Sequence, residues 1–164
     1  MKALSVVAVL LMASPALASD EALFQAIEEG RQLAAIALVR RGEADVDARN
    51  AGRETPLHRA IEKDMRGLAQ ALVQAGASVR ARTRNGETAL HFAALHEDPY
   101  YVDLLLGSGA DPKARNDDGE SVLFWALLSG HAVVAQRLMD RGADPNVRDL
   151  KGNTASELLE GLHK

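Results

Sequence analysis

Thr55-Pro56-Leu57-His58 opens an apolar stretch of the chain, and the same pattern returns three times at intervals of 33 residues. The later copies of this four-residue box are Thr88-Ala89-Leu90-His91, Ser121-Val122-Leu123-Phe124 and Thr154-Ala155-Ser156-Glu157. Two sets of glycines recur in phase with the box, at Gly52, Gly86, Gly119 and Gly152 and at Gly42, Gly76, Gly109 and Gly142. Three landmarks that share one period indicate a protein built from stacked structural repeats.

Each period predicts two short helices followed by a turn. The hydroxyl residue of the box suits a helix N-cap, and Pro56 suits the first helical position, where its missing N–H costs no hydrogen bond. A second apolar segment, from Leu68 to Val73, predicts a second helix, and Gly76 then supplies the left-handed residue that ends it. Neither helix can bury its apolar face alone, so the repeats are expected to stack.

The period, the Thr-Pro-Leu-His and Thr-Ala-Leu-His boxes and the Gly-Ala-Asp-Pro segments at 109–112 and 142–145 resemble ankyrin repeats. The resemblance implies an all-α solenoid of helix–turn–helix pairs linked by β-hairpin turns. We expect three full repeats with a divergent N-terminal repeat and a truncated C-terminal cap. Their expected bounds are 51–83, 84–116 and 117–149 for the full repeats, about 20–50 for the first and 150–164 for the cap.

The pattern departs from the family's in single positions. Arg53 stands where the later repeats carry a turn glycine, and Phe124 replaces the box histidine. Glu97-Asp98 occupies the place of the Gly-His pair at Gly130-His131. These departures put individual turns in question and leave the expected fold unchanged.

Residues 1–18 have the order of a secretory signal peptide. Lys2 precedes an apolar run, and the small residues Ala16-x-Ala18 that follow predict cleavage after Ala18. The apolar run is shorter than the roughly 20 residues that span a bilayer, so no membrane insertion is expected after cleavage. The mature domain, residues 19–164, is then expected in the periplasm or secreted. An N-terminal core helix is the alternative interpretation.

The composition excludes several classes of function. A chain of 164 residues with a net charge of −4 lacks the dense basic surface that nucleic acid requires, so no nucleic-acid partner is expected. The absence of cysteine excludes disulfides, thiolate metal sites and a cysteine nucleophile. No Walker loop or Gly-x-Ser-x-Gly elbow occurs, and the resemblance implies a structural role for His58 and His91. We therefore expect no enzyme, no cofactor and no metal site.

Two surfaces are candidate binding sites. The resemblance implies that a protein partner contacts the hairpin tips and variable first-helix positions on the concave side. Carried over to this chain, the helix positions are Glu62, Lys63, Leu95, His96, Trp125, Leu128 and Ser129, and the tip positions are Arg84, Asn85, Asp117 and Asp118. Leu95 and Leu128, with Phe92 and Trp125, form an apolar column that is either inter-repeat core or an exposed anchor patch.

The second candidate surface consists of two charged columns. Arginines precede each turn at Arg49, Arg82, Arg115 and Arg148, and glutamates follow it at Glu54, Glu87 and Glu120. Because these positions face one another across a hairpin, we expect Glu–Arg pairs within and between repeats. The columns form either a solvated ion-pair ladder of little energetic value or an edge that recognises a charged partner.

These observations together predict a non-catalytic protein–protein interaction module that is monomeric on its own. The expected role is that of an exported accessory or scaffold protein for a periplasmic or secreted partner. An immunity or inhibitor protein that blocks a toxin or enzyme is an alternative, and an exported enzyme is another. The functional prediction rests on analogy between folds, because a fold alone does not identify a partner.

Overall fold

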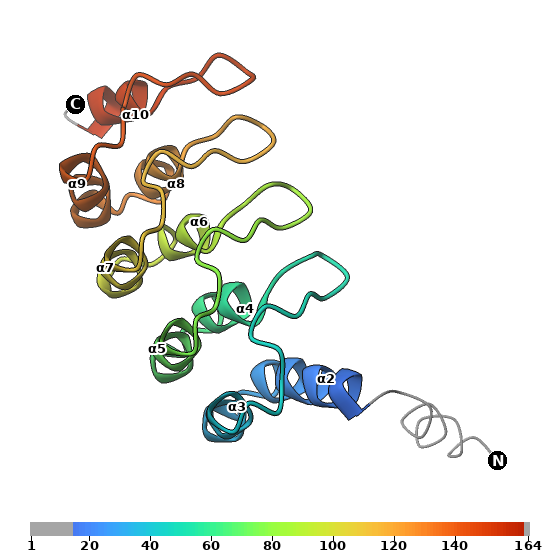
Figure 1. Ribbon diagram of the computed structural model, residues 1–164. Coiled ribbons are helices and arrows are strands. Elements are labelled where there is room, and N and C mark those ends of the chain that lie inside the picture. The colour runs from blue at the N-terminus through green and yellow to red at the C-terminus, as the bar shows by residue number, and fades with distance from the viewer. Residues whose placement is uncertain (1–14, 163–164) are drawn as a thin grey trace.

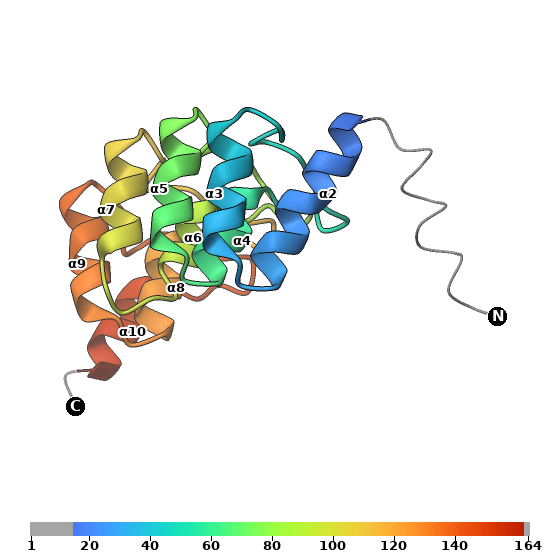
Figure 2. The ribbon, with the colours of Figure 1, turned by 90° about the horizontal axis from the view of Figure 1, so that it is seen from below.

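The computed structural model describes residues 15–162, which contain a stack of helix pairs (Figure 1). The first helices of the successive pairs are α2 (Pro15–Glu28), α4 (Pro56–Glu62), α6 (Ala89–Ala93), α8 (Val122–Leu128) and α10 (Ala155–Leu162). The second helices are α3 (Gln32–Arg40), α5 (Arg66–Gln74), α7 (Tyr100–Gly107) and α9 (Ala132–Asp140). The second helices form one row, and hairpin loops project from the other side of the stack (Figures 1 and 2). The predicted all-α solenoid is confirmed.

The box residues begin the first helix of each repeat, as the sequence predicts. In two repeats the histidine three positions after the cap accepts the backbone N–H of the capping threonine, with Thr55 N to His58 Nδ1 at 3.1 Å and the same distance from Thr88 to His91. Where Phe124 replaces the histidine, the Ser121 hydroxyl instead accepts the N–H of Phe124 at 3.1 Å. The box therefore satisfies N–H groups that the start of a helix leaves unpaired.

One core runs through the whole stack. The leucines of the first three boxes, Leu57, Leu90 and Leu123, have no exposed surface, and neither do Leu72, Leu105 and Leu138 in the second helices. Each helix pair packs on the next pair along the chain, through contacts such as α4 with α6 and α7 with α9. Equivalent leucines in successive repeats are thus buried in the same way.

The hairpin loops are held by few ladder hydrogen bonds. Within residues 15–162, each of the last three loops contains a single antiparallel bridge, formed by Arg82–Thr88, Arg115–Ser121 and Arg148–Thr154. Arg53 has a φ of 61°, in the left-handed region that Gly86 adopts at 77° in the next loop. The first loop therefore makes the same turn as the others with a residue that disfavours this conformation.

The third repeat is irregular between its two helices. Helix α6 has only five residues, and Glu97 does not adopt the left-handed conformation that Asp64 and Gly130 have at equivalent places. Side-chain contacts to the preceding repeat hold this segment. Tyr101 donates its hydroxyl to Asp64 at 2.8 Å, and Arg66 pairs with Asp98 at 2.8 Å. The departure at Glu97-Asp98 thus changes one connection and not the stack.

The predicted signal peptide lies mostly outside the described residues, which begin at Pro15. The proposed cleavage position, after Ala18, falls within α2, and from Ala18 onward the first fully buried residue of that helix is Leu23. No helix in residues 15–162 combines the length and the apolar character needed to cross a bilayer.

Candidate protein-binding surface

The apolar column predicted on the first helices divides into exposed and half-buried members. Leu95, just after α6, is 48% exposed, and Leu128, at the end of α8, is 65% exposed. Phe92 and Trp125 are half-buried and pack against the core. We call these four residues the apolar strip. Because α6 and α8 are in contact, the strip crosses two adjacent repeats.

The aromatic members of the strip are fixed by the box histidines of the preceding repeat. The rings of His58 and Phe92 meet edge to face with their centroids 5.4 Å apart, and those of His91 and Trp125 meet in the same way at 5.3 Å. Trp125 also donates its indole N–H to Glu120 at 2.8 Å. The aromatic rings therefore form a rigid base, and the two leucines are the side chains that project into solvent.

A charged cluster lies next to the apolar strip, at the first-helix positions of the preceding repeat. Arg59 bonds to Glu28 at 2.6 Å and also pairs with Glu62, while Lys63 pairs with Glu28 at 3.2 Å. The hydrogen bond from Arg59 lowers the pKa of the Glu28 carboxyl below its ordinary value. The predicted site residues Glu62 and Lys63 are thus exposed and belong to a mixed-charge network between repeats.

The remaining predicted helix positions differ in how freely they meet solvent. His96 is half-buried, and its Nε2 lies 2.8 Å from the carbonyl oxygen of Ile61, so that nitrogen is committed to the preceding repeat. Ser129 is exposed as the C-cap of α8. His96 is therefore bound within the fold, whereas Ser129 lies open beside Leu128.

The predicted tip residues are exposed, and their backbones join successive loops. Asp117 donates its backbone N–H to the carbonyl of Asn85 at 2.9 Å, and Leu150 donates to the carbonyl of Asp118 at the same distance. The side chain of Arg84 reaches back to the carbonyl of Ala51 at 2.7 Å. The tips thus form a continuous edge along the stack.

The expected Glu–Arg pairs do not form, and this prediction was wrong. Among residues 15–162 no ion pair joins the two columns. Three of the arginines donate to carbonyl groups instead, as Arg115 does to Gly119 at 2.8 Å and to Arg148 at 2.5 Å, and Arg82 pairs with Asp117. The glutamates accept from residues four positions earlier, as Glu120 does from Asn116 at 2.9 Å. With one bridge per hairpin, the loop carbonyls are left to be paired by arginine side chains.

Within 15–162, no three His, Asp or Glu side chains group in a way that could hold a metal ion. His58 and His91 are buried in their boxes, and burial lowers the pKa of each to about 4. Both histidines therefore remain neutral at ordinary pH and serve as hydrogen-bonding and packing groups.

Stacked helix pairs with a shared core and an exposed apolar strip define this protein as a helical-repeat solenoid. The family model for ankyrin repeats, in three copies, matches residues 65–149, a little over half of the chain. The protein therefore belongs to the ankyrin repeat family. A search of the curated proteins finds no match. Ankyrin repeats are general protein–protein interaction modules and are typically non-catalytic.

Proposed function

We propose that this protein is an exported, non-catalytic module that binds a protein partner with its first-helix face. The observation that carries the proposal is the exposure of Leu95, just after α6, and of Leu128, at the end of α8, in neighbouring repeats whose first helices also carry the half-buried rings of Phe92 and Trp125. Exposed apolar side chains that gather on one surface are a common mark of a protein–protein contact site. The partner would bury the two leucines.

The surroundings of the apolar strip also suit an interface. The charged cluster around Arg59 lies on one side, and the exposed hairpin tips lie along the edge. An apolar centre with a polar rim is the common arrangement in specific protein–protein contacts. The role of an accessory or scaffold protein for a resident partner is the one that we propose for this surface.

Export is part of the proposal, and the support for it is the signal-peptide pattern of residues 1–18 together with the absence of cysteine. Cleavage after Ala18 would leave Leu23 and the rest of the core intact. Intact-mass measurement on the protein recovered from the periplasm or medium tests it. A mature chain that begins at Ser19 supports export, and a chain recovered there with Met1 in place contradicts it.

The binding face is tested with a matched pair of double variants. The protein and its Leu95→Asp/Leu128→Asp variant are used as bait on the exported fraction of the source cells. The control is Leu33→Asp/Val133→Asp, which changes exposed apolar residues of the second helices, 81% and 59% exposed. A partner that is retained by the protein and by the control, and lost with the strip variant, supports the proposal.

Circular dichroism of all three proteins is the accompanying measurement. We expect the strip variant to stay folded, because its two leucines are exposed. A strip variant that folds and still retains every captured protein contradicts the first-helix face as the binding surface. Loss of capture with the Leu33→Asp/Val133→Asp control alone would place the surface on the second helices instead.

A further inference from the structure

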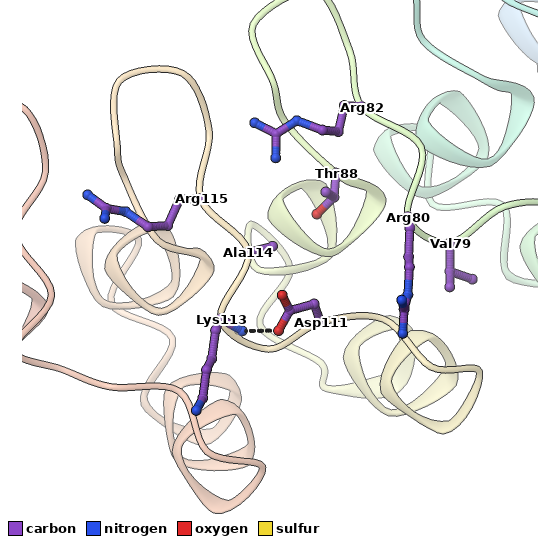
Figure 3. A pocket seen from close by; sticks show the side chains of 8 residues that line it. All are labelled: Val79, Arg80, Arg82, Thr88, Asp111, Lys113, Ala114 and Arg115. Atoms are coloured by element: carbon purple, nitrogen blue, oxygen red, sulfur yellow. Dashed lines mark hydrogen bonds between the residues drawn. The ribbon is translucent and has the colours of Figure 1, made fainter.

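A basic groove lies between two neighbouring repeats, where the chain rises from the second helix into the hairpin. It has a volume of about 350 Å³, and its lining includes Arg80, Arg82, Lys113 and Arg115 with Asp111 as its one carboxylate (Figure 3). The chain as a whole carries more acidic than basic residues, with a net charge of −4. Four cations around one groove are therefore a local reversal of the protein's charge.

The four cations form two rows that follow the repeat. Arg80 and Lys113 are 33 residues apart, and so are Arg82 and Arg115. In Figure 3, Arg82 and Arg115 point the same way, and Arg80 and Lys113 both extend away from the hairpins. Each row thus presents one positive charge from each of the two repeats that line the groove.

Part of this charge is available to a ligand, whereas the guanidinium of Arg115 already donates to the carbonyls of Gly119 and Arg148. Lys113 Nζ has no hydrogen-bond or ion-pair partner within residues 15–162, and Arg80 uses its Nε for the carbonyl of Gly109 at 3.0 Å. Asp111 accepts the backbone N–H of Lys113 at 2.9 Å, so its carboxylate is turned to the loop (Figure 3). Arg82 bonds to Asp117 at 3.2 Å, in a pair exposed to solvent. Asp111, the one carboxylate in the lining, therefore does not neutralise the positive charge of the groove.

We infer that this groove binds an extended acidic segment of a protein, at a surface separate from the first-helix face and beyond the function proposed above. Packed helices lie about 10 Å apart, and this sets the spacing of equivalent residues in neighbouring repeats. An extended polyproline-type peptide advances about 3.1 Å per residue and returns to the same face every third residue. A carboxylate at every third position therefore matches the rows of Arg80 with Lys113 and of Arg82 with Arg115.

A protein segment fits this groove better than nucleic acid does. The two rows supply one charge each per repeat, whereas a nucleic-acid backbone needs a dense basic surface. Asp117 pairs with Arg82 and so lowers the positive charge that the groove offers to a continuous line of phosphates.

The experiment measures peptide binding by fluorescence anisotropy with the purified protein at low salt. The probe is a labelled peptide of four Pro-Pro-Glu triplets, and the comparison peptide has the same composition with its glutamates in one block. We expect the triplet peptide to bind several-fold more tightly than the block peptide. Lys113→Glu should weaken binding by roughly tenfold, because it reverses an unpaired charge of the groove. Its matched control is Lys151→Glu, the same change on an exposed lysine outside the groove.

Each outcome decides the inference. The inference is supported if Lys113→Glu weakens peptide binding and Lys151→Glu changes it little. Undiminished peptide binding by Leu95→Asp/Leu128→Asp shows in addition that the groove is separate from the first-helix face. Equal binding of the two peptides, or equal loss with both lysine variants, shows diffuse charge attraction and overturns it. Tighter binding of a single-stranded DNA oligomer than of the triplet peptide also overturns it. If Lys113→Glu is unfolded by circular dichroism, Lys113→Gln takes its place with the same expected direction.

Discussion

At the scale of single residues, the buried histidines connect local structure to stability. His58 and His91 are fully buried, each within 3.1 Å of its threonine's backbone N–H. Their Nδ1 atoms accept that N–H, so the bond requires a ring without a proton on Nδ1. Burial lowers the pKa of each ring to about 4, whereas the unfolded chain has the ordinary value near 6.5. The folded protein therefore holds both histidine rings in their neutral form.

This difference predicts that the free energy of unfolding falls as the pH is lowered from 7 toward 4. Between the two pKa values the unfolded chain binds the histidine proton and the folded chain does not, so acid favours unfolding. The loss at pH 5 is on the order of 2 kcal/mol for each histidine, from the pKa values of about 4 and 6.5. Urea unfolding of the protein and of His91→Phe between pH 5 and 7 measures it.

His91→Phe is a suitable variant because the chain carries Phe124 at the equivalent place of the next repeat. There the hydroxyl of Ser121 accepts the N–H of Phe124, and Thr88 can accept from residue 91 in the same way. We expect the variant to lose stability less steeply with falling pH than the protein does. Parallel pH curves for the two proteins would mean that His91 takes up its proton equally in both states.

At the scale of the elements, the sequence predicts what depends on residues close together in the chain. The helix starts at the boxes follow from local capping. The sequence left the turn at Arg53 in question, and there the backbone adopts the left-handed conformation of the glycines at the equivalent positions of other repeats. The contacts of the arginine column were not predictable in this way. The side chain of Arg115 pairs with the carbonyl of Arg148, 33 residues away, and the absence of a longer hairpin ladder leaves that carbonyl available.

The same limit applies to the candidate surface. The spacing of Leu95 and Leu128 put them in one column, and only the packing shows that they are exposed while Phe92 and Trp125 rest on histidines. His96 looked equivalent to Ser129 in sequence, yet its ring bonds to Ile61 because the irregular connection after α6 turns it toward the preceding repeat. Side-chain direction in an irregular segment depends on tertiary contacts that repeat spacing does not encode.

Arg115→Gln is expected to lower the free energy of unfolding by about 1 kcal/mol, because it removes two hydrogen bonds to loop carbonyl groups. Arg115→Lys should lose nearly as much, since one ammonium on a flexible stem does not reproduce the planar guanidinium that reaches both carbonyls. Denaturant unfolding measures both. Arg40→Gln, on an exposed arginine of α3, is the control and should change little. Full rescue by lysine would show that charge alone, and not the two bonds, stabilises the loop.

At the scale of the whole molecule, the main helix contacts within residues 15–162 join each repeat to its neighbours, so stability is expected to be shared along the stack. The ends differ from the middle in this respect. Helix α7 lies between pairs on both sides, whereas α10 packs on α8 and ends the described stack (Figure 1). The same substitution should therefore cost more in the middle than at the end.

Leu105→Ala and Leu158→Ala test this expectation with one chemical change at two places. Leu105 in α7 is fully buried, and Leu158 in α10 is only partly buried. We expect Leu105→Ala to lower the free energy of unfolding by roughly 2–5 kcal/mol, from the lost burial and the cavity left behind. Leu158→Ala should cost clearly less, because its side chain already meets solvent and the surrounding end of the stack can relax into the space. Denaturant melts of the two variants give the comparison. Equal costs would mean that the terminal helix shares fully in one cooperative unit, and a larger cost at Leu158 would mean that the stack is stabilised from its C-terminal end.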